Sequence, residues 1–157
     1  MNSRLEVALG TRHVGIVVED IKISKKFYEA IGFVSEGSSS AEMGEGLSKI
    51  LGVRNASIVT EKFTLNVVPE LSIWREEGFR LELVEYTTGV NASVGKKNNT
   101  IGKVHICFSV SDLALVLDNL KNLNFDVSNH PHRHGNVLMT YLFDPNGVSI
   151  ELIQKLD

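Results

Sequence analysis

The sequence predicts an α+β fold built from two tandem copies of one βαβββ module, and three observations support this. Residues 13–33 align without a gap with residues 105–125, so that a histidine opens both segments. A second pair of segments, 80–86 and 149–155, matches in the same order. In each copy, β-branched segments surround one segment whose apolar residues recur with helical period. Because an internal repeat determines the whole architecture, the two copies predict a mixed or antiparallel sheet with helices on one face.

The two copies are expected to be halves of a single domain spanning residues 1–157, because each is short for independent stability. We place module 1 at about 10–88 and module 2 at about 103–157. The intervening residues, about 89–102, are polar and rich in Gly and Asn, which is typical of a linker.

Composition excludes several function classes. Hydrophobic residues make up 43% and charged residues 22%, and the net charge of −3 gives no indication of nucleic-acid binding. No apolar run approaches the length that crosses a membrane, and the N-terminus lacks an apolar signal core. Cys107 is the only cysteine, so an intrachain disulfide is excluded and a cytoplasmic location is expected.

Module 1 begins with a strand and a capped helix. Asp20 suits the helix N-cap, and Gly32 suits the left-handed residue that closes the helix. In chain order we expect a strand at 12–18, that helix, a strand beginning at 33–36, a loop at 38–40, a short helix at 44–52, and strands at 56–68 and 79–86. Residues 71–78 are interpreted as an insertion.

Module 2 repeats this order. Asp112 takes the N-cap position, and Asn124 stands where the first copy has Gly32. Residues 144–147, Asp-Pro-Asn-Gly, are typical of a type I turn and predict a hairpin. The expected strands are at 104–110, 125–128, 137–143 and 148–154.

Side-chain alternation along these strands favours a metal site shared by the two copies. His13 and His105 lie on the strand face opposite to the apolar residues that would cover the helices. Glu82 and Glu151 each stand between two apolar residues of a later strand. Such a carboxylate either points to water or has a buried partner. The repeat therefore predicts one divalent metal with four ligands, namely His13, Glu82, His105 and Glu151.

Each of these positions also has a structural interpretation. The histidines could be hydrogen-bonded residues at strand ends, and the glutamates could face solvent. Glu85 is an alternative to Glu82, although it lies on the opposite strand face and aligns with Gln154 rather than with an acid. Cys107 is interpreted as a buried structural cysteine, with a place beside His105 in the cavity as the alternative.

A second group of histidines has no counterpart in module 1. His130, His132 and His134 alternate with other residues between Pro131 and Gly135. His-rich tracts can bind metal, but the flanking Pro and Gly indicate a loop. We therefore expect a solvated loop, near the mouth of the cavity.

These segments together resemble the vicinal oxygen chelate superfamily, whose members include glyoxalase I, methylmalonyl-CoA epimerase, extradiol dioxygenases and bleomycin-type resistance proteins. The resemblance rests on the two histidine-bearing segments, on LELVEY at 81–86 and on DPNGVSIELIQ at 144–154. It covers nearly the whole chain, with residues 36–78 and the linker as its weakest stretches. It implies paired βαβββ modules that form a curled mixed sheet around a metal cavity, and a homodimer whose site lies within one chain or across the interface.

The resemblance also carries the ligand set over by position to His13, Glu82, His105 and Glu151. Two imidazoles and two carboxylates suit Zn, Ni, Co, Mn or Fe(II), so the ligand types leave the metal open. Glutamate at position 82 is more like glyoxalase I than like the epimerase. The segment after it, Val84-Glu85-Tyr86, departs from the Asn-Trp-Gly type of bacterial glyoxalase I, which leaves the substrate open.

Three functions follow as hypotheses. The first is a glyoxalase- or epimerase-type lyase or isomerase, in which the metal stabilises an enediolate or enolate and Glu151 or Glu82 moves the proton of a small carbonyl substrate, a thiol adduct or a thioester. The second is an Fe(II) dioxygenase that cleaves a diol or a hydroxy acid. The third is a non-catalytic protein that sequesters a small molecule, against which four intact candidate ligands argue.

Overall fold

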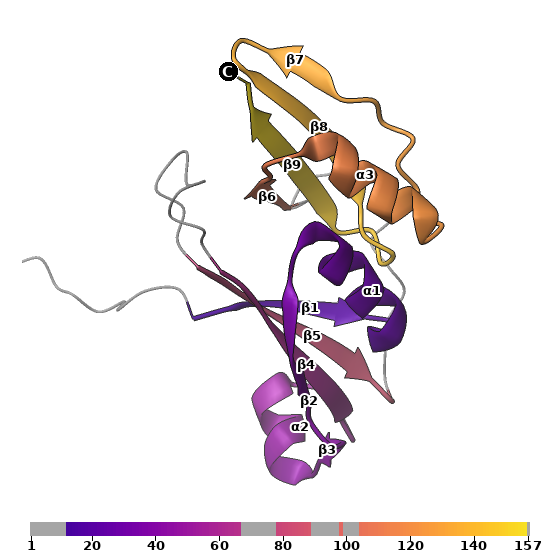
Figure 1. Cartoon of the computed structure of the whole chain (residues 1–157). Coiled ribbons are helices and arrows are strands. Elements are labelled where there is room, and N and C mark those ends of the chain that lie inside the picture. Colours follow the sequence, from indigo (N-terminus) through magenta and orange to yellow (C-terminus); the bar gives the residue numbers. More distant parts are fainter. Residues whose placement is uncertain (1–11, 67–77, 89–97, 99–103, 157) are drawn as a thin grey trace, which may run out of the picture.

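The computed structural model describes residues 12–66, 78–88, 98 and 104–156. Most of the predicted linker and residues 71–77 of the predicted insertion lie outside this part of the chain. The two βαβββ modules are present, each with a sheet of its own, and Figure 1 shows these sheets as separate layers with two helices between them. None of the described helices is long and apolar enough to cross a membrane.

Module 1 contains the larger sheet. Its elements are β1 (Val14–Val18), α1 (Ile21–Ile31), β2 (Val34–Ser38), β3 (Glu42–Met43), α2 (Glu45–Leu51), β4 (Ser57–Leu65) and β5 (Phe79–Tyr86). The strand order is β1-β5-β4-β2, with β3 paired to the beginning of β4. β1 runs parallel to β5, whereas β4 is antiparallel to both of its neighbours β5 and β2.

Module 2 repeats the arrangement with fewer elements. It contains β6 (His105–Ser109), α3 (Leu113–Asn122), β7 (His132–His134), β8 (Val137–Phe143) and β9 (Ser149–Lys155), in the sheet order β6-β9-β8-β7. The registers of the two parallel pairs agree: Glu82 lies opposite Gly15 in module 1, and Glu151 lies opposite Cys107 in module 2. The alignment of the two copies is therefore a structural equivalence as well.

Two local predictions for the strands were wrong. Residues 125–128 form no strand, because Phe125 and Val127 pack against the core instead of pairing. The expected loop at the histidine cluster contains β7, whose residues His132 and His134 pair with β8 in antiparallel register. The second strand of module 2 therefore comes later in the chain than the apolar pattern indicated.

Both long helices begin and end as the sequence predicts. Asp20 accepts hydrogen bonds from the backbone N–H groups of Lys22 and Ile23, and Asp112 accepts one from Leu115. Gly32 and Asn124 have positive φ angles, 116° and 62°, where the chain leaves the first and the second of these helices.

A second pair of side chains also caps these helices. Glu85 Oε2 accepts a hydrogen bond from the Ile21 backbone N–H at 2.9 Å. Gln154 Oε1 accepts the corresponding bond from Leu113 at 2.8 Å. The two residues are equivalent in the repeat, and the function they share is to satisfy the first free N–H of a helix. This explains why an amide can replace the acid in module 2.

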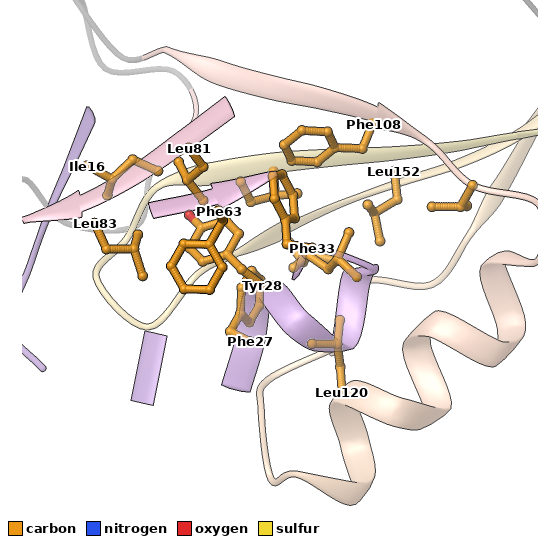
Figure 2. Packing of buried hydrophobic residues seen from close by; sticks show 14 of the residues in the cluster. Ile16, Phe27, Tyr28, Phe33, Phe63, Leu81, Leu83, Phe108, Leu120 and Leu152 are labelled. Carbon is orange, nitrogen blue, oxygen red and sulfur yellow. The ribbon is translucent and has the colours of Figure 1, made fainter. Parts of the chain in front are cut away.

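One hydrophobic core joins the modules. Its aromatic rings meet edge to face: Phe33 of module 1 lies 5.3 Å from Phe108 of module 2, and Phe27 lies 5.3 Å from Phe125, between ring centroids. Figure 2 shows Phe33 between Phe108 and Tyr28. Because both sheets turn their apolar faces to this core, the opposite face of each sheet carries the polar candidates.

A buried polar contact also connects the modules. The Tyr28 hydroxyl of α1 donates a hydrogen bond to Asp144 Oδ2 at 3.0 Å, and both residues are fully buried. Asp144 also accepts bonds from the backbone of Asn146 and Val148, which fixes the predicted turn. The Asn146 side chain in turn binds Ser24 Oγ. The turn of module 2 is thus anchored on the first helix of module 1.

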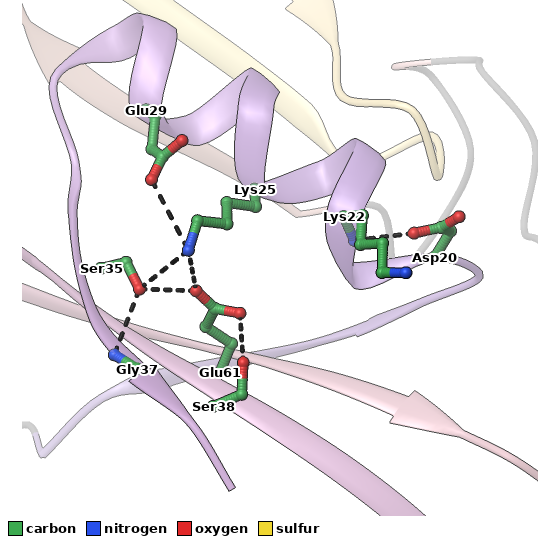
Figure 3. Close-up of polar contacts among 8 residues, drawn as sticks. All are labelled: Asp20, Lys22, Lys25, Glu29, Ser35, Gly37, Ser38 and Glu61. Carbon is green, nitrogen blue, oxygen red and sulfur yellow. Dashed lines mark hydrogen bonds and ion pairs between the residues drawn. The ribbon is translucent and has the colours of Figure 1, made fainter.

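A buried carboxylate lies under α1. Glu61 of β4 is 3% exposed and accepts hydrogen bonds from Lys25 Nζ at 2.6 Å, from Ser35 at 2.5 Å and from Ser38 at 2.6 Å (Figure 3). Burial alone would raise the pKa of this carboxyl, but the three donors and the Lys25 charge outweigh it and hold the pKa below its ordinary value.

The substitution Glu61→Gln should make this contribution visible as a pH-dependent stability difference. A carboxyl with a lowered folded-state pKa stabilises the protein above its unfolded pKa, and the gain is lost as pH falls through the folded pKa. We expect the variant to be about 2 kcal/mol less stable than wild type at neutral pH. The difference should shrink below about pH 4. Urea unfolding across this range measures it.

The control for this experiment is Glu45→Gln, which removes an exposed partner of Lys49 on α2. It should leave stability nearly unchanged at every pH. If the difference in unfolding free energy between Glu61→Gln and wild type stayed constant from neutral to acid pH, the carboxylate charge would contribute nothing to stability.

Candidate functional site

In module 2, a histidine and a glutamate meet on the sheet face turned away from the core. His105 opens β6, and Glu151 lies on β9 between Ile150 and Leu152, whose side chains are fully buried on the other face. The His105 Nε2 and Glu151 Oε2 atoms are 3.2 Å apart, and the two side chains are 51% and 10% exposed. This is the arrangement that strand alternation predicted.

Module 1 holds the equivalent pair in the equivalent place. His13 directly precedes β1, and Glu82 lies on β5 between the buried residues Leu81 and Leu83. The distance between His13 Nε2 and Glu82 Oε2 is 3.8 Å. The repeat therefore produces two similar His–Glu pairs, one on the outer face of each sheet.

The distance within the pair of module 2 suits two ligands of one divalent metal, and the distance within the pair of module 1 is slightly longer. Two donor atoms that each lie about 2.1 Å from one ion are separated by roughly 3.0–3.4 Å in tetrahedral or octahedral geometry. The 3.2 Å pair lies within that interval, and the 3.8 Å pair is a few tenths of an ångström wider. Neutral imidazole nitrogen and carboxylate oxygen are the donors that Zn, Mn, Ni, Co and Fe(II) accept.

The chain by itself does not bring both pairs together. Among the residues that the structure describes, no group of three or more His, Cys, Asp or Glu side chains could hold a metal ion. The reason is architectural, since both sheets turn their apolar faces to one common core and carry their His–Glu pairs on the faces away from it. His13, Glu82, His105 and Glu151 thus form two half-sites, and the four-ligand centre stays a prediction.

Sequence analysis missed a third residue of the half-site in module 2. The Tyr141 hydroxyl donates a hydrogen bond to Glu151 Oε2 at 2.8 Å, and its ring lies edge to face against His105. Burial raises the pKa of Tyr141 to about 12, aided by the bond to Glu151 and its charge. The predicted turn could not have revealed this residue, because Tyr141 lies three residues before it and Glu151 lies four residues after it, and the two pair only because the connection also includes Val148.

Two alternatives from the sequence are now decided. Cys107 was expected to be buried, but it is exposed and shares the outer face with His105 and Glu151. Although the residue as a whole is exposed, partial desolvation of its thiol, together with the Glu151 charge, raises the pKa of Cys107 to about 11. Glu85, the rival of Glu82, points to the helix side and caps α1, so it is a structural residue.

The remaining histidines lie at the edge of the same sheet. His132 and His134 are exposed on β7, and they pair with Met139 and Val137. Val137, Met139 and Tyr141 occupy alternate positions of β8, so their side chains lie on one face of the sheet. His132 and His134, as the partners of Met139 and Val137, lie on that face too. The structure therefore places part of the cluster on the outer face of module 2, at the far edge from His105.

The described surface includes a small cavity and a larger open hollow. A cavity of about 280 Å³ adjoins the half-site of module 2 and is lined by Asn98, Val104, His105, Tyr141 and Ser149. A larger open hollow of about 880 Å³ lies beside α2, with Met43, Ser48, Arg54 and Thr88 among its lining residues. The larger hollow includes no member of either His–Glu pair, so size alone does not identify the candidate site.

Comparisons with known proteins agree with this architecture. Residues 10–152 match the family model of the Glyoxalase/Bleomycin resistance protein/Dioxygenase superfamily. A glyoxalase family protein from Bacillus cereus has a similar structure, with a TM-score of 0.75 at 20% identity, and the similarity covers 100% of this chain and 99% of that one. No curated protein sequence matches the chain significantly.

Two further solved structures share the fold. A glyoxalase I mutant from Zea mays superposes with a TM-score of 0.62 at 20% identity, over 92% of this chain but only 44% of that longer one. A mutant of the fosfomycin resistance protein FosX from Listeria monocytogenes, complexed with Mn(II) and 1S,2S-dihydroxypropylphosphonic acid, superposes with a TM-score of 0.56 at 16% identity, over 92% of this chain and 91% of that one.

Proposed function

The chain belongs to the Glyoxalase/Bleomycin resistance protein/Dioxygenase superfamily, and on that premise we propose that it is a divalent-metal-dependent lyase or isomerase. Its substrate would be a small carbonyl compound, such as a thiol adduct or a thioester. The observation that carries this proposal is the pair of equivalent His–Glu contacts, His13 with Glu82 and His105 with Glu151, on matching faces of duplicated sheets.

We infer that the active form is a homodimer in which module 1 of one copy meets module 2 of the other. The outer face of each sheet carries half of a ligand set, and the shared core leaves both faces uncovered within the chain. A two-fold interface is self-complementary, so one contact of this kind would complete two equivalent sites. The cytoplasm remains the expected location, from the single cysteine.

The chain's own residues would divide the chemistry as follows. His13, Glu82, His105 and Glu151 would hold the metal, which when bound supplies a Lewis acid for two neighbouring substrate oxygens. Glu151 is nearly buried and has its Oε2 atom fixed by Tyr141, so it is the better-oriented carboxylate for moving a proton on the adjacent carbon. Tyr141 would act as a positioning residue for Glu151.

Elemental analysis of the protein purified without added metal tests this function. We expect about one divalent ion per chain. The loaded protein should then turn over a member of a panel of 2-oxo-aldehyde thiol adducts and acyl-CoA thioesters, and a chelator should abolish the activity. Oxygen consumption with iron alone would favour a dioxygenase instead. A metal-free protein that binds a small molecule tightly would indicate sequestration.

A further inference from the structure

The duplication allows the two halves of the candidate site to be compared residue by residue. The histidine and the glutamate are present in both copies, and they serve the function that the two half-sites share, the proposed binding of metal. Positions at which the copies differ indicate how each half-site would contact the substrate. The shared register identifies these positions without reference to any other protein, because Glu82 and Glu151 occupy the same place in their sheets.

In module 1, the neighbours of Glu82 are cationic. Lys62 on β4 lies directly opposite Glu82 in antiparallel register, and Arg80 precedes Glu82 by two residues on the same strand. Directly opposed side chains have Cβ atoms about 5 Å apart, and residues two apart on a strand share a face. Lys62 and Arg80 therefore project from the outer face on two sides of Glu82.

These two cations are available to a ligand. Both side chains belong to exposed residues, and neither forms an ion pair with another described residue. The paired neighbours across β4 and β2 offer no compensating acid, since Gly37 lies opposite Lys62 and Thr64 lies opposite Arg80. Among the residues paired with Lys62 or Arg80 across the sheet, Glu82 is thus the one carboxylate, and it is itself a candidate metal ligand.

In module 2, the equivalent neighbours of Glu151 carry no charge. Tyr141 stands opposite Glu151, where module 1 has Lys62, and Ser149 takes the place of Arg80. The Tyr141 hydroxyl is already bonded to Glu151. The half-site of module 2 also adjoins the cavity of about 280 Å³, and among the described residues that line it there is no Lys or Arg. The completed site would therefore have one cationic and one uncharged half.

From this asymmetry we propose that the substrate carries a separate anionic group, a carboxylate or a phosphonate, that is bound by Lys62 and Arg80 beside the chelating oxygens. Its uncharged part lies against Tyr141 and Ser149 of the other half. The inference rests on the proposed metal site, which it deepens by assigning the substrate's charge and its orientation. Arg suits such a group because it can bind two oxygens at once, while Lys adds a point charge.

Two isosteric hydroxamates test the proposal on the metal-loaded protein. Succinic acid monohydroxamate presents two chelating oxygens and a distant carboxylate, whereas isocaprohydroxamic acid replaces that carboxylate with an isopropyl group. Calorimetric titration should show that wild type binds the carboxylate probe about tenfold more tightly. The preference should decrease as ionic strength rises, because the cations are exposed.

Variants assign the preference to the two side chains. Lys62→Gln and Arg80→Gln should each remove most of it, and should leave the affinity for isocaprohydroxamic acid unchanged. The matched control is Lys26→Gln, which removes the same charge from an exposed position on α1, on the other side of the sheet, and should keep the full preference.

The outcomes separate this inference from the proposed function. Wild-type protein without metal would refute the metal site itself. Metal-loaded protein that binds both hydroxamates equally, or that keeps its preference in the Lys62→Gln and Arg80→Gln variants, would overturn the anion site alone.

Discussion

Replacing one ligand of either half-site, as in His13→Ala or Glu151→Gln, is expected to remove metal and activity together. Each variant leaves three of four donors, and Glu151→Gln also replaces an anionic ligand with a neutral amide. Loss of a residue that only supports a ligand costs roughly 10–100-fold in metal affinity. We therefore expect losses of more than about 100-fold here. Metal content per chain after dialysis, and turnover of the loaded protein, measure the effect.

The matched control is Glu85→Gln. Glu85 is separated from Glu82 by two residues, but it caps α1, and Gln154 makes the same bond to α3 in module 2. The repeat itself shows that glutamine suits this position, so the variant should keep its fold, its metal and its activity. Full metal content in His13→Ala and Glu151→Gln would remove these residues from the ligand set.

The second large effect is expected from Asp144→Ala, on stability. The substitution removes a buried acceptor that serves the Tyr28 hydroxyl and two backbone N–H groups of the turn. Each buried donor left without a partner costs about 1–3 kcal/mol. We expect the free energy of unfolding to fall by about 3 kcal/mol or more. Urea unfolding at neutral pH measures this.

Two companion variants locate the effect. Tyr28→Phe removes only the contact between the modules and should cost about 1 kcal/mol, because the ring still fills the core. Asp118→Ala removes an exposed acid of α3 and should change nothing measurable. If the urea midpoint of Asp144→Ala were the same as that of wild type, the turn would not anchor the two modules.

The pH dependence of Asp144 should oppose that of Glu61. Burial, only partly offset by its hydrogen bonds, raises the pKa of Asp144, so its ionisation weakens the fold as pH rises through the folded pKa. The lowered pKa of Glu61 has the reverse sign. Comparing each variant with wild type at the same pH separates the two contributions.

Much of the fold could be predicted from the sequence because the modules repeat strong local signals. The apolar stripes, the caps Asp20 and Asp112 and the hairpin turn at 144–147 all favour the same structure as the tertiary packing. The ranges 79–86 and 137–143 match β5 and β8 residue for residue. The prediction of an α+β fold with two βαβββ modules is confirmed.

The errors occurred where tertiary contacts override local pattern. Phe125 and Val127 have strand character, but their side chains fill the core beside the helices. β7 consists of His132–His134, polar and exposed residues that become a strand only because β8 offers a free edge. Neither outcome follows from a single window of sequence.

The candidate site was predictable in its parts and incomplete in its assembly. Alternation predicts that the histidines and glutamates lie on the outer faces, and the structure places His13 with Glu82 and His105 with Glu151 as pairs. Whether the pairs share one ion depends on which surfaces meet, and a repeat does not encode that. Tyr141 was missed because only the strand register connects it to Glu151.

Mixing two inactive variants tests the central claim most directly. A dimer of one His13→Ala chain and one His105→Ala chain, isolated with two different affinity tags, contains both defects in one of its sites and none in the other if each site spans two copies. Such a heterodimer should recover roughly half of the wild-type metal content and activity. If each site lay within one chain, both sites would remain defective, and a heterodimer as empty as its parents would contradict the proposed assembly.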